Sequence, residues 1–182
     1  MTARSPFGFA DELRLGLRGM VRRVWGRRGV KVRRRLQLSY QWRYLFVVVD
    51  GRAGRIYWCW HESMAATELL GMVRAVQQQT DLAALVWDGA PSHREERVQA
   101  LGLPLIGLPP YSPELNPAER FFQEVRRAVE GEPYATLDEK VAAVQGVLAE
   151  WDADPDRVRS LCGWQWIEDA AQTLPTALDF AA

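Results

Sequence analysis

The chain has 182 residues, 48% of them apolar, and its 23 basic residues balance 23 acidic ones. This length is enough to bury one hydrophobic core, so we predict a single domain over residues 1–182. The longest clear apolar run, YLFVVV at residues 44–49, is far shorter than the roughly 18 residues of a membrane helix. A helical membrane protein is therefore excluded, and we expect no membrane partner.

The two cysteines and the start of the chain favour a reducing compartment. Cys59 and Cys162 are far apart and in no metal-binding spacing, which is typical of buried thiols in cytosolic proteins. No basic, apolar and small-residue leader opens the chain, so we expect no secretion. A cytoplasmic location follows from both observations.

The zero net charge conceals a basic segment early in the chain. Residues 13–49 contain eleven Lys or Arg and no Asp or Glu, whereas residues 50–182 contain 11 basic and 21 acidic residues. This asymmetry favours a surface that binds a polyanion such as DNA. The alternative is that the arginines only solvate the outer side of a β-ribbon. The candidate DNA-binding residues are Arg22, Arg23, Arg27, Arg28, Lys31, Arg33, Arg34 and Arg35.

The first half of the chain is typical of strands and one helix. A short strand is predicted over residues 6–11, and alternating apolar and basic residues predict a half-buried strand over residues 30–38. Residues 43–60 have the pattern of a β-hairpin whose turn is the glycine-rich DGRAG at residues 50–54. Apolar spacing then predicts a helix over residues 64–79.

The middle of the chain has the pattern of a βαβ unit. Residues 82–87 form a continuous apolar run that predicts a strand buried on both faces. A capping-box pattern predicts a short helix over residues 92–100, and a second apolar strand is predicted over residues 103–108. Two strands joined in this way are parallel, so their carboxyl ends open on one edge of the sheet, where α/β proteins place their sites.

A stiff loop leads from this unit into a helix. In LPPYSPELNPAERFF (residues 108–122), Asn116 has the features of an N-cap, Pro117 suits the first helical position, and Glu119 falls at the third. Further helices are predicted in a C-terminal helical part over residues 136–182. Strands followed by helices indicate a layered α/β domain.

Two carboxylates are candidates for chemistry. Asp88 ends the buried strand and Glu119 opens the next helix, so both are expected at the same sheet edge, where their oxygens suit Mg²⁺ or Mn²⁺. Two such ions need more than two carboxylates to neutralise and bridge them, so we expect a third acid. The alternatives remain open at this point: Glu119 could complete a capping box with Asn116, and Asp88 could cap its turn. His93 could assist the chemistry or be structural.

Two motifs together resemble a known family. VWDGAPSH (residues 86–93) and LPPYSPELNPAERFFQEVRR (residues 108–127) resemble the catalytic domain of IS630/Tc1/mariner transposases, in particular the bacterial IS630-like group. The resemblance implies an RNase H-like α/β fold, with a mixed five-stranded sheet flanked by helices, and a DDE metal-binding triad. Its second acid maps onto Asp88 and its third onto Glu119.

The first acid of the triad has two candidates. FADELRLGL (residues 9–17) is similar to the family's opening strand, which makes Asp11 the favoured candidate. Asp50 is the rival, although an Asp-Gly pair in a hairpin turn has an ordinary conformational explanation. The expected catalytic and metal-binding residues are therefore Asp11, Asp88 and Glu119.

The family's activity implies cofactors and partners for this chain. We expect two Mg²⁺ or Mn²⁺ ions, and we expect the enzyme to cleave element ends in double-stranded DNA and to join them to a TA target, as a homodimer in the bacterial nucleoid. Family members usually carry N-terminal helix-turn-helix modules, which we expect to be absent here because Met1 lies only ten residues before Asp11. An upstream reading frame could supply them. The alternative function is a catalytically silent DNA-binding or regulatory remnant.

Overall fold

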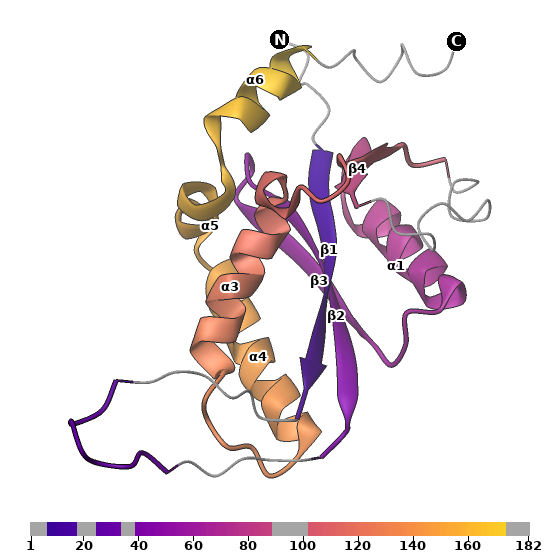
Figure 1. The fold of residues 1–182 in the computed structure, drawn as a ribbon. Helices are drawn as coiled ribbons and strands as arrows, with labels where there is room; N and C mark the ends of the chain where they lie inside the picture. Colours follow the sequence, from indigo (N-terminus) through magenta and orange to yellow (C-terminus); the bar gives the residue numbers. More distant parts are fainter. Residues whose placement is uncertain (1–6, 18–24, 34–38, 89–101, 174–182) are drawn as a thin grey trace.

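A mixed β-sheet forms the centre of the protein. The computed structural model describes residues 7–17, 25–33, 39–88 and 102–173 (Figure 1). Within these residues, one sheet of five strands has the order β3-β2-β1-β4-β5. Strand β1 pairs antiparallel with β2 and parallel with β4, which itself is parallel to β5. The mixed five-stranded sheet expected from the sequence is therefore confirmed. The strands are β1 (Phe7–Gly16), β2 (Trp42–Asp50), β3 (Arg55–His61), β4 (Ala84–Trp87) and β5 (Leu105–Gly107).

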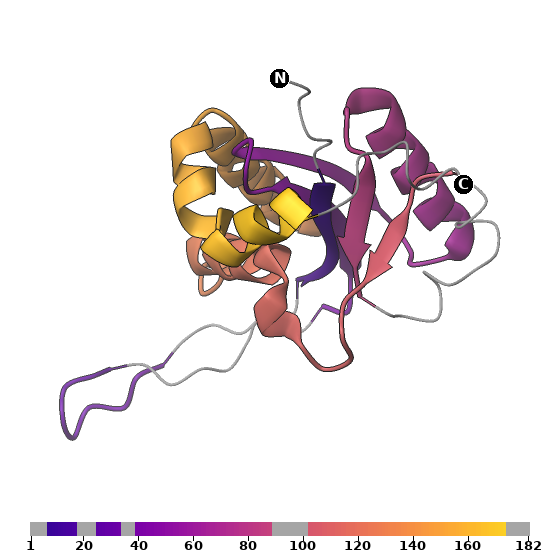
Figure 2. The same cartoon turned by 90° about the horizontal axis from the view of Figure 1, so that it is seen from above.

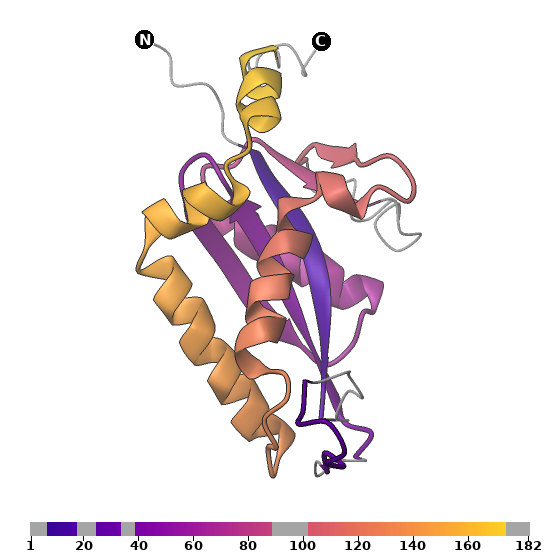
Figure 3. The same ribbon diagram turned by 60° about the vertical axis from the view of Figure 1, so that its left-hand side comes forward.

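Helices cover both faces of this sheet. Helix α1 (Ala66–Gln79) lies on one face, and α3 (Pro117–Val129), α4 (Leu137–Asp152) and α5 (Pro155–Cys162) lie on the other (Figures 1 and 3). A short 3-10 turn, η2 (Pro113–Leu115), precedes α3, and α6 (Gln165–Thr173) follows α5. Within the described residues, no helix is long and apolar enough to span a bilayer.

Strand β2 contributes side chains to the core on each face of the sheet. Its side chains point alternately to the two faces, so Phe46 and Val48 pack towards α1, whereas Leu45 and Val47 pack towards α3 and α4. All four are at most 1% exposed. The continuous apolar run at residues 44–49 is thus a central strand with helices on both sides.

The predicted hairpin turn is present, and it explains Asp50. The Asp50 carboxylate accepts hydrogen bonds from the backbone N–H of Arg52 at 3.1 Å and of Ala53 at 2.9 Å. Burial raises the pKa of Asp50. A Cβ at Gly51 would lie 2.4 Å from the carbonyl oxygen of Cys162, so the turn packs closely on the end of α5. Asp50 therefore has a conformational role in its turn.

The strand predicted over residues 30–38 is wrong for its described part. Residues 30–33 form no strand, and Val30 and Val32 are 60% and 49% exposed. The cause is topological: β1 pairs directly with β2, and residues 25–33 of the connection between them stand away from the sheet (Figure 2). Residues 34–38 and the helix expected over residues 92–100 lie outside the described residues.

Candidate active site

Asp11 lies in the middle of β1, on the face covered by α3. Leu13 and Leu15, which share its side of the strand, belong to the core beneath α3 and α4. Ala10, on the opposite side, packs with the α1 core. Asp11 is therefore an acidic side chain on an otherwise apolar face of the central strand.

Asp88 follows directly on β4, the parallel neighbour of β1. The register pairs Phe7 with Ala84 and Phe9 with Val86. Two more residues along both strands bring Asp88 level with Asp11. Asp88 is exposed, so the pair lies where the buried part of β4 ends. This is the arrangement expected at the carboxyl edge of parallel strands.

Helix α3 brings Glu119 to the same region through Asn116. The Asn116 Oδ1 accepts from the Ala118 N–H at 3.0 Å, which caps the helix. The Asn116 Nδ2 donates to the Ala10 carbonyl oxygen and to the Asp11 carboxylate, both at 3.2 Å. The start of α3 is thus anchored on β1 beside Asp11, and Glu119 lies one turn further along.

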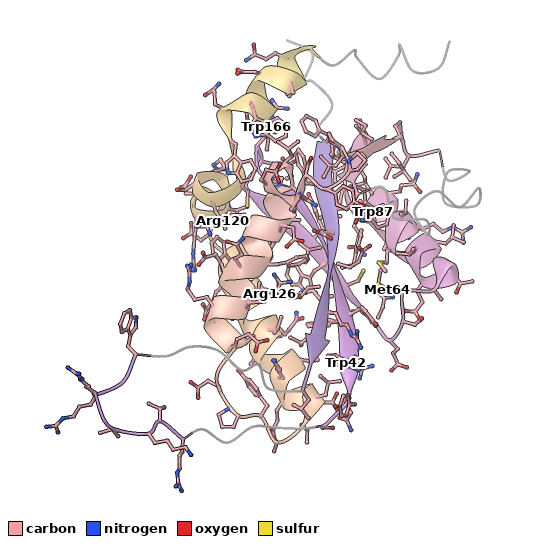
Figure 4. All side chains as sticks on the ribbon, in the orientation of Figure 1. Trp42, Met64, Trp87, Arg120, Arg126 and Trp166 are labelled. Atoms are coloured by element: carbon pink, nitrogen blue, oxygen red, sulfur yellow. The ribbon has the colours of Figure 1, made fainter. Side chains whose placement is uncertain are left out.

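The capping-box interpretation of Glu119 is wrong. The Asn116 N–H, which a capping box would pair with the Glu119 carboxylate, donates to the Pro113 carbonyl oxygen at 3.0 Å. The Glu119 Oε2 lies 3.8 Å from Nη1 of Arg126, two turns along α3, and its side chain is 38% exposed. Arg126 lies on the α3 side of the sheet, opposite the α1 side that holds Trp87 (Figure 4). The Glu119 carboxylate is therefore not used in a capping box and lies partly exposed beside Arg126.

The three acids interact electrostatically. Burial, followed by the charges of Glu119, Glu12 and Asp88, raises the pKa of Asp11 to about 7, against the lowering effect of the hydrogen bond from the Glu12 N–H. That bond is 2.8 Å long. Carboxylates that repel one another in this way are stabilised when a cation is placed among them.

The arrangement is open rather than a finished metal centre. Among the described ranges, no group of three or more His, Cys, Asp or Glu side chains is placed so that it could hold a metal ion. Asp11, Asp88 and Glu119 are near neighbours whose charges interact, but their oxygens do not surround one point. His93 lies outside the described residues.

The basic segment presents its cations to solvent. Arg27, Arg28, Lys31 and Arg33 are all exposed, on a part of the chain with a turn at residues 27–30 that stands away from the sheet (Figure 2). The other expected DNA-binding residues, Arg22, Arg23, Arg34 and Arg35, lie outside the described residues.

Two contacts near the site were not anticipated from the sequence. The capping role of Asn116 was predicted, but its bond to Asp11 was not, because no local pattern tells which strand a helix start will touch. Arg126 was also missed as the partner of Glu119. The available signal for this pair was its spacing, because Glu119 and Arg126 are seven residues apart on one helix and so lie on the same face.

Comparison with known proteins identifies a family for this chain. Residues 6–140 match the family described as DDE superfamily endonuclease, which is more than half of the chain and includes all three acids. A comparison with curated protein sequences finds no significant match.

Several solved structures share the fold. The Mos1 transposase paired-end complex with the left transposon end matches with a TM-score of 0.65 and 18% identity, over 88% of this chain and 52% of that chain. The Mos1 mariner paired-end complexes with Mn and with Mg match with TM-scores of 0.64 and 0.65 and identities of 19% and 20%, over 87% of this chain and 52% and 51% of theirs. The chain thus spans about half the length of these transposases.

These matches confirm the expected RNase H-like fold and the resemblance to catalytic domains of Tc1/mariner-type DDE transposases. The sheet order and the helices on both faces agree with this fold. The chain belongs to the DDE superfamily of endonucleases.

Proposed function

We propose that this chain is the catalytic domain of an IS630-like transposase that cleaves DNA and transfers strands with Mg²⁺ or Mn²⁺. The observation that carries the proposal is that Asp11 on β1 feels the charges of Asp88, after β4, and of Glu119, at the start of α3, within the region that matches the endonuclease family. Further support is the raised pKa of Asp11, which has burial as its first cause and the charges of Glu119, Glu12 and Asp88 as further ones.

The donor set fits divalent ions. Asp11, Asp88 and Glu119 would hold them, because carboxylate oxygens are the ligands that Mg²⁺ and Mn²⁺ prefer. When bound, two such ions supply activation of the attacking hydroxyl and charge stabilisation at the leaving oxygen of a phosphodiester. The protein contributes the positions: Asp11 on a central strand, Asp88 beside it and Glu119 on an anchored helix.

The proposed substrate is double-stranded DNA. It comprises the element's ends and a TA target. The exposed basic segment would bind its backbone phosphates. A homodimer on DNA in the bacterial nucleoid, and an upstream helix-turn-helix product that reads the ends, complete the proposal. Its support is the family match and the fold shared with transposases solved in complexes with transposon ends.

Replacing Asp88 with asparagine tests the catalytic proposal. We expect the full chain to nick supercoiled plasmid DNA with Mn²⁺ and Asp88→Asn to lose this activity, because the amide cannot neutralise the ions. Asp81→Asn is the matched control, since Asp81 is exposed just before the same strand β4. Equal nicking by wild type and Asp88→Asn would contradict the catalytic role of Asp88, and no nicking by either would favour the silent remnant instead.

Neutralising the tip of the basic segment tests DNA binding. The double variant Arg27→Gln/Arg28→Gln should weaken duplex binding regardless of sequence and lower the slope of log K against log salt by up to about 1.8, or about 0.9 per lost phosphate contact. Fluorescence anisotropy at several salt concentrations measures this slope. The control Arg55→Gln/Arg74→Gln removes two exposed arginines elsewhere. An identical slope for both double variants would rule out a special role for the segment.

A further inference from the structure

We propose that Asn116 is a positioning residue for the metal site, which fixes the Asp11 carboxylate at the same time as it caps α3. The inference rests on the proposed function in one respect, since it takes Asp11 as a metal ligand. In this proposal, one buried amide connects β1 and α3, two of the three elements that carry the proposed metal ligands.

The hydrogen bonds of Asn116 account for its whole amide. The residue is 2% exposed, so its polar atoms depend on partners within the protein. Oδ1 accepts from the Ala118 N–H at 3.0 Å, and Nδ2 donates to the Ala10 carbonyl oxygen and the Asp11 Oδ2 at 3.2 Å each. The orientation of the amide follows from chemistry, because a flipped amide would set its NH₂ against an N–H and its oxygen against two oxygens.

The bond from Asn116 restrains Asp11 at its second oxygen. The first, Oδ1, accepts from the Glu12 N–H at 2.8 Å, and the second, Oδ2, accepts from Asn116. Hydrogen bonds to both oxygens limit rotation of the carboxylate, and each oxygen keeps a further lone pair for a cation. Ligating carboxylates are commonly oriented in this way by hydrogen-bonding neighbours.

Capping alone does not require asparagine at this position. Ser, Thr and Asp cap helices about as well, and α4 and α5 are capped by Thr136 and Asp154, exposed side chains that accept from the N–H of Glu139 and Arg157. Among these cap residues, asparagine alone offers an acceptor for the helix and two N–H donors for the strand. The need for two N–H donors at residue 116 comes from β1, whose Ala10 carbonyl and Asp11 carboxylate accept from them.

The variant Asn116→Ser separates the two roles. Serine retains the acceptor for α3 but removes both donors to β1. We expect Mn²⁺ binding to the full chain, measured by calorimetry, to weaken about 10–100-fold. The Mn²⁺ concentration for half-maximal plasmid nicking should rise by the same factor. The melting temperature should fall by only about 2–4 °C, because the cap is kept and about 1 kcal/mol of hydrogen bonding to β1 is lost.

The matched control is Asp154→Ser, which makes the same kind of cap exchange before a proline on α5. We expect it to leave Mn²⁺ affinity unchanged. If Asn116→Ser fails to fold, Asn116→Thr, which also caps, replaces it in the same measurement. Wild-type Mn²⁺ affinity in a folded Asn116 variant would overturn the inference.

The outcomes distinguish this inference from the proposed function. If wild type binds Mn²⁺ but nicks no DNA, the proposed function fails, and the Mn²⁺ affinity of the Asn116 variant still decides the inference. If wild type nicks and Asp88→Asn does not, but the Asn116 variant keeps wild-type affinity, the function stands and the inference fails. If wild type binds no Mn²⁺ at all, both fail.

Discussion

Replacing Glu119 with glutamine is expected to reduce metal-dependent DNA cleavage at least about a thousandfold while leaving the protein folded. The loss corresponds to about 4 kcal/mol of transition-state stabilisation, which is within the several kcal/mol that a properly held metal ion supplies. Stability should change by less than about 1 kcal/mol, because Glu119 is partly exposed and its contact with Arg126 is long, at 3.8 Å. Plasmid nicking with Mn²⁺ and thermal unfolding of the same preparation measure the two effects.

Glu124→Gln provides the control on the same helix. Glu124 also carries a carboxylate on α3, but it pairs with Arg127 at 2.6 Å and Arg120 at 3.8 Å. This variant should cleave like wild type. A Glu119→Gln protein that unfolds, or one that cleaves as well as Glu124→Gln, would contradict a role for Glu119 as a ligand.

Replacing Asp11 with asparagine is expected to abolish cleavage and to stabilise the metal-free protein. The pKa of Asp11 is about 7 in the folded protein against an ordinary value of 3.8, because the carboxyl is buried and lies near Glu119, Glu12 and Asp88. That pKa difference corresponds to at most about 4 kcal/mol in the free energy of unfolding, and the partial exposure of Asp11 reduces this value. We therefore expect Asp11→Asn to be more stable than wild type by about 2 kcal/mol at pH 8.

The pH dependence has a definite sign. Asp11 binds its proton more tightly in the folded than in the unfolded chain, so its contribution to stability is fully present below about pH 4 and is lost as the pH rises through about 7. The advantage of Asp11→Asn should therefore grow between pH 4 and pH 7 and level off above pH 8. Denaturant unfolding without metal, at pH 5 and pH 8, measures this growth.

Divalent ions should reduce the difference in stability between wild type and Asp11→Asn. Mg²⁺ or Mn²⁺ that binds the folded state stabilises wild type, and stabilises Asp11→Asn less. Asp50→Asn is the informative control, because Asp50 is the other candidate first acid and its carboxylate bonds within a hairpin turn. We expect Asp50→Asn to retain cleavage. The reverse result, with Asp50→Asn inactive and Asp11→Asn active, would exchange the two assignments.

Local patterns were sufficient for much of this fold. The hairpin around the turn at residues 50–54, the parallel strands β4 and β5, and the start of α3 at Asn116 depend on turn chemistry, apolar runs and capping, which act over a few residues. The motifs around Asp88 and Glu119 were local in the same sense. These features could therefore be predicted before the structure was known.

Features that depend on distant partners could not be predicted. Alternation over residues 30–38 indicated a strand, yet a half-buried strand needs a surface to cover, and the direct pairing of β1 with β2 leaves none. The bond from Asn116 to Asp11 joins residues 105 positions apart, beyond the reach of any local pattern.

The place of Asp11 within β1 makes this strand intolerant of changes in length. Because β1 is paired on both sides, an insertion or deletion of one residue before Asp11 would move the carboxylate to the α1 face, where Ala10 now packs. The same shift would force Glu12 and Arg14 against the core beneath α3. Natural variation in this strand should therefore exchange one apolar residue for another and preserve the count of residues.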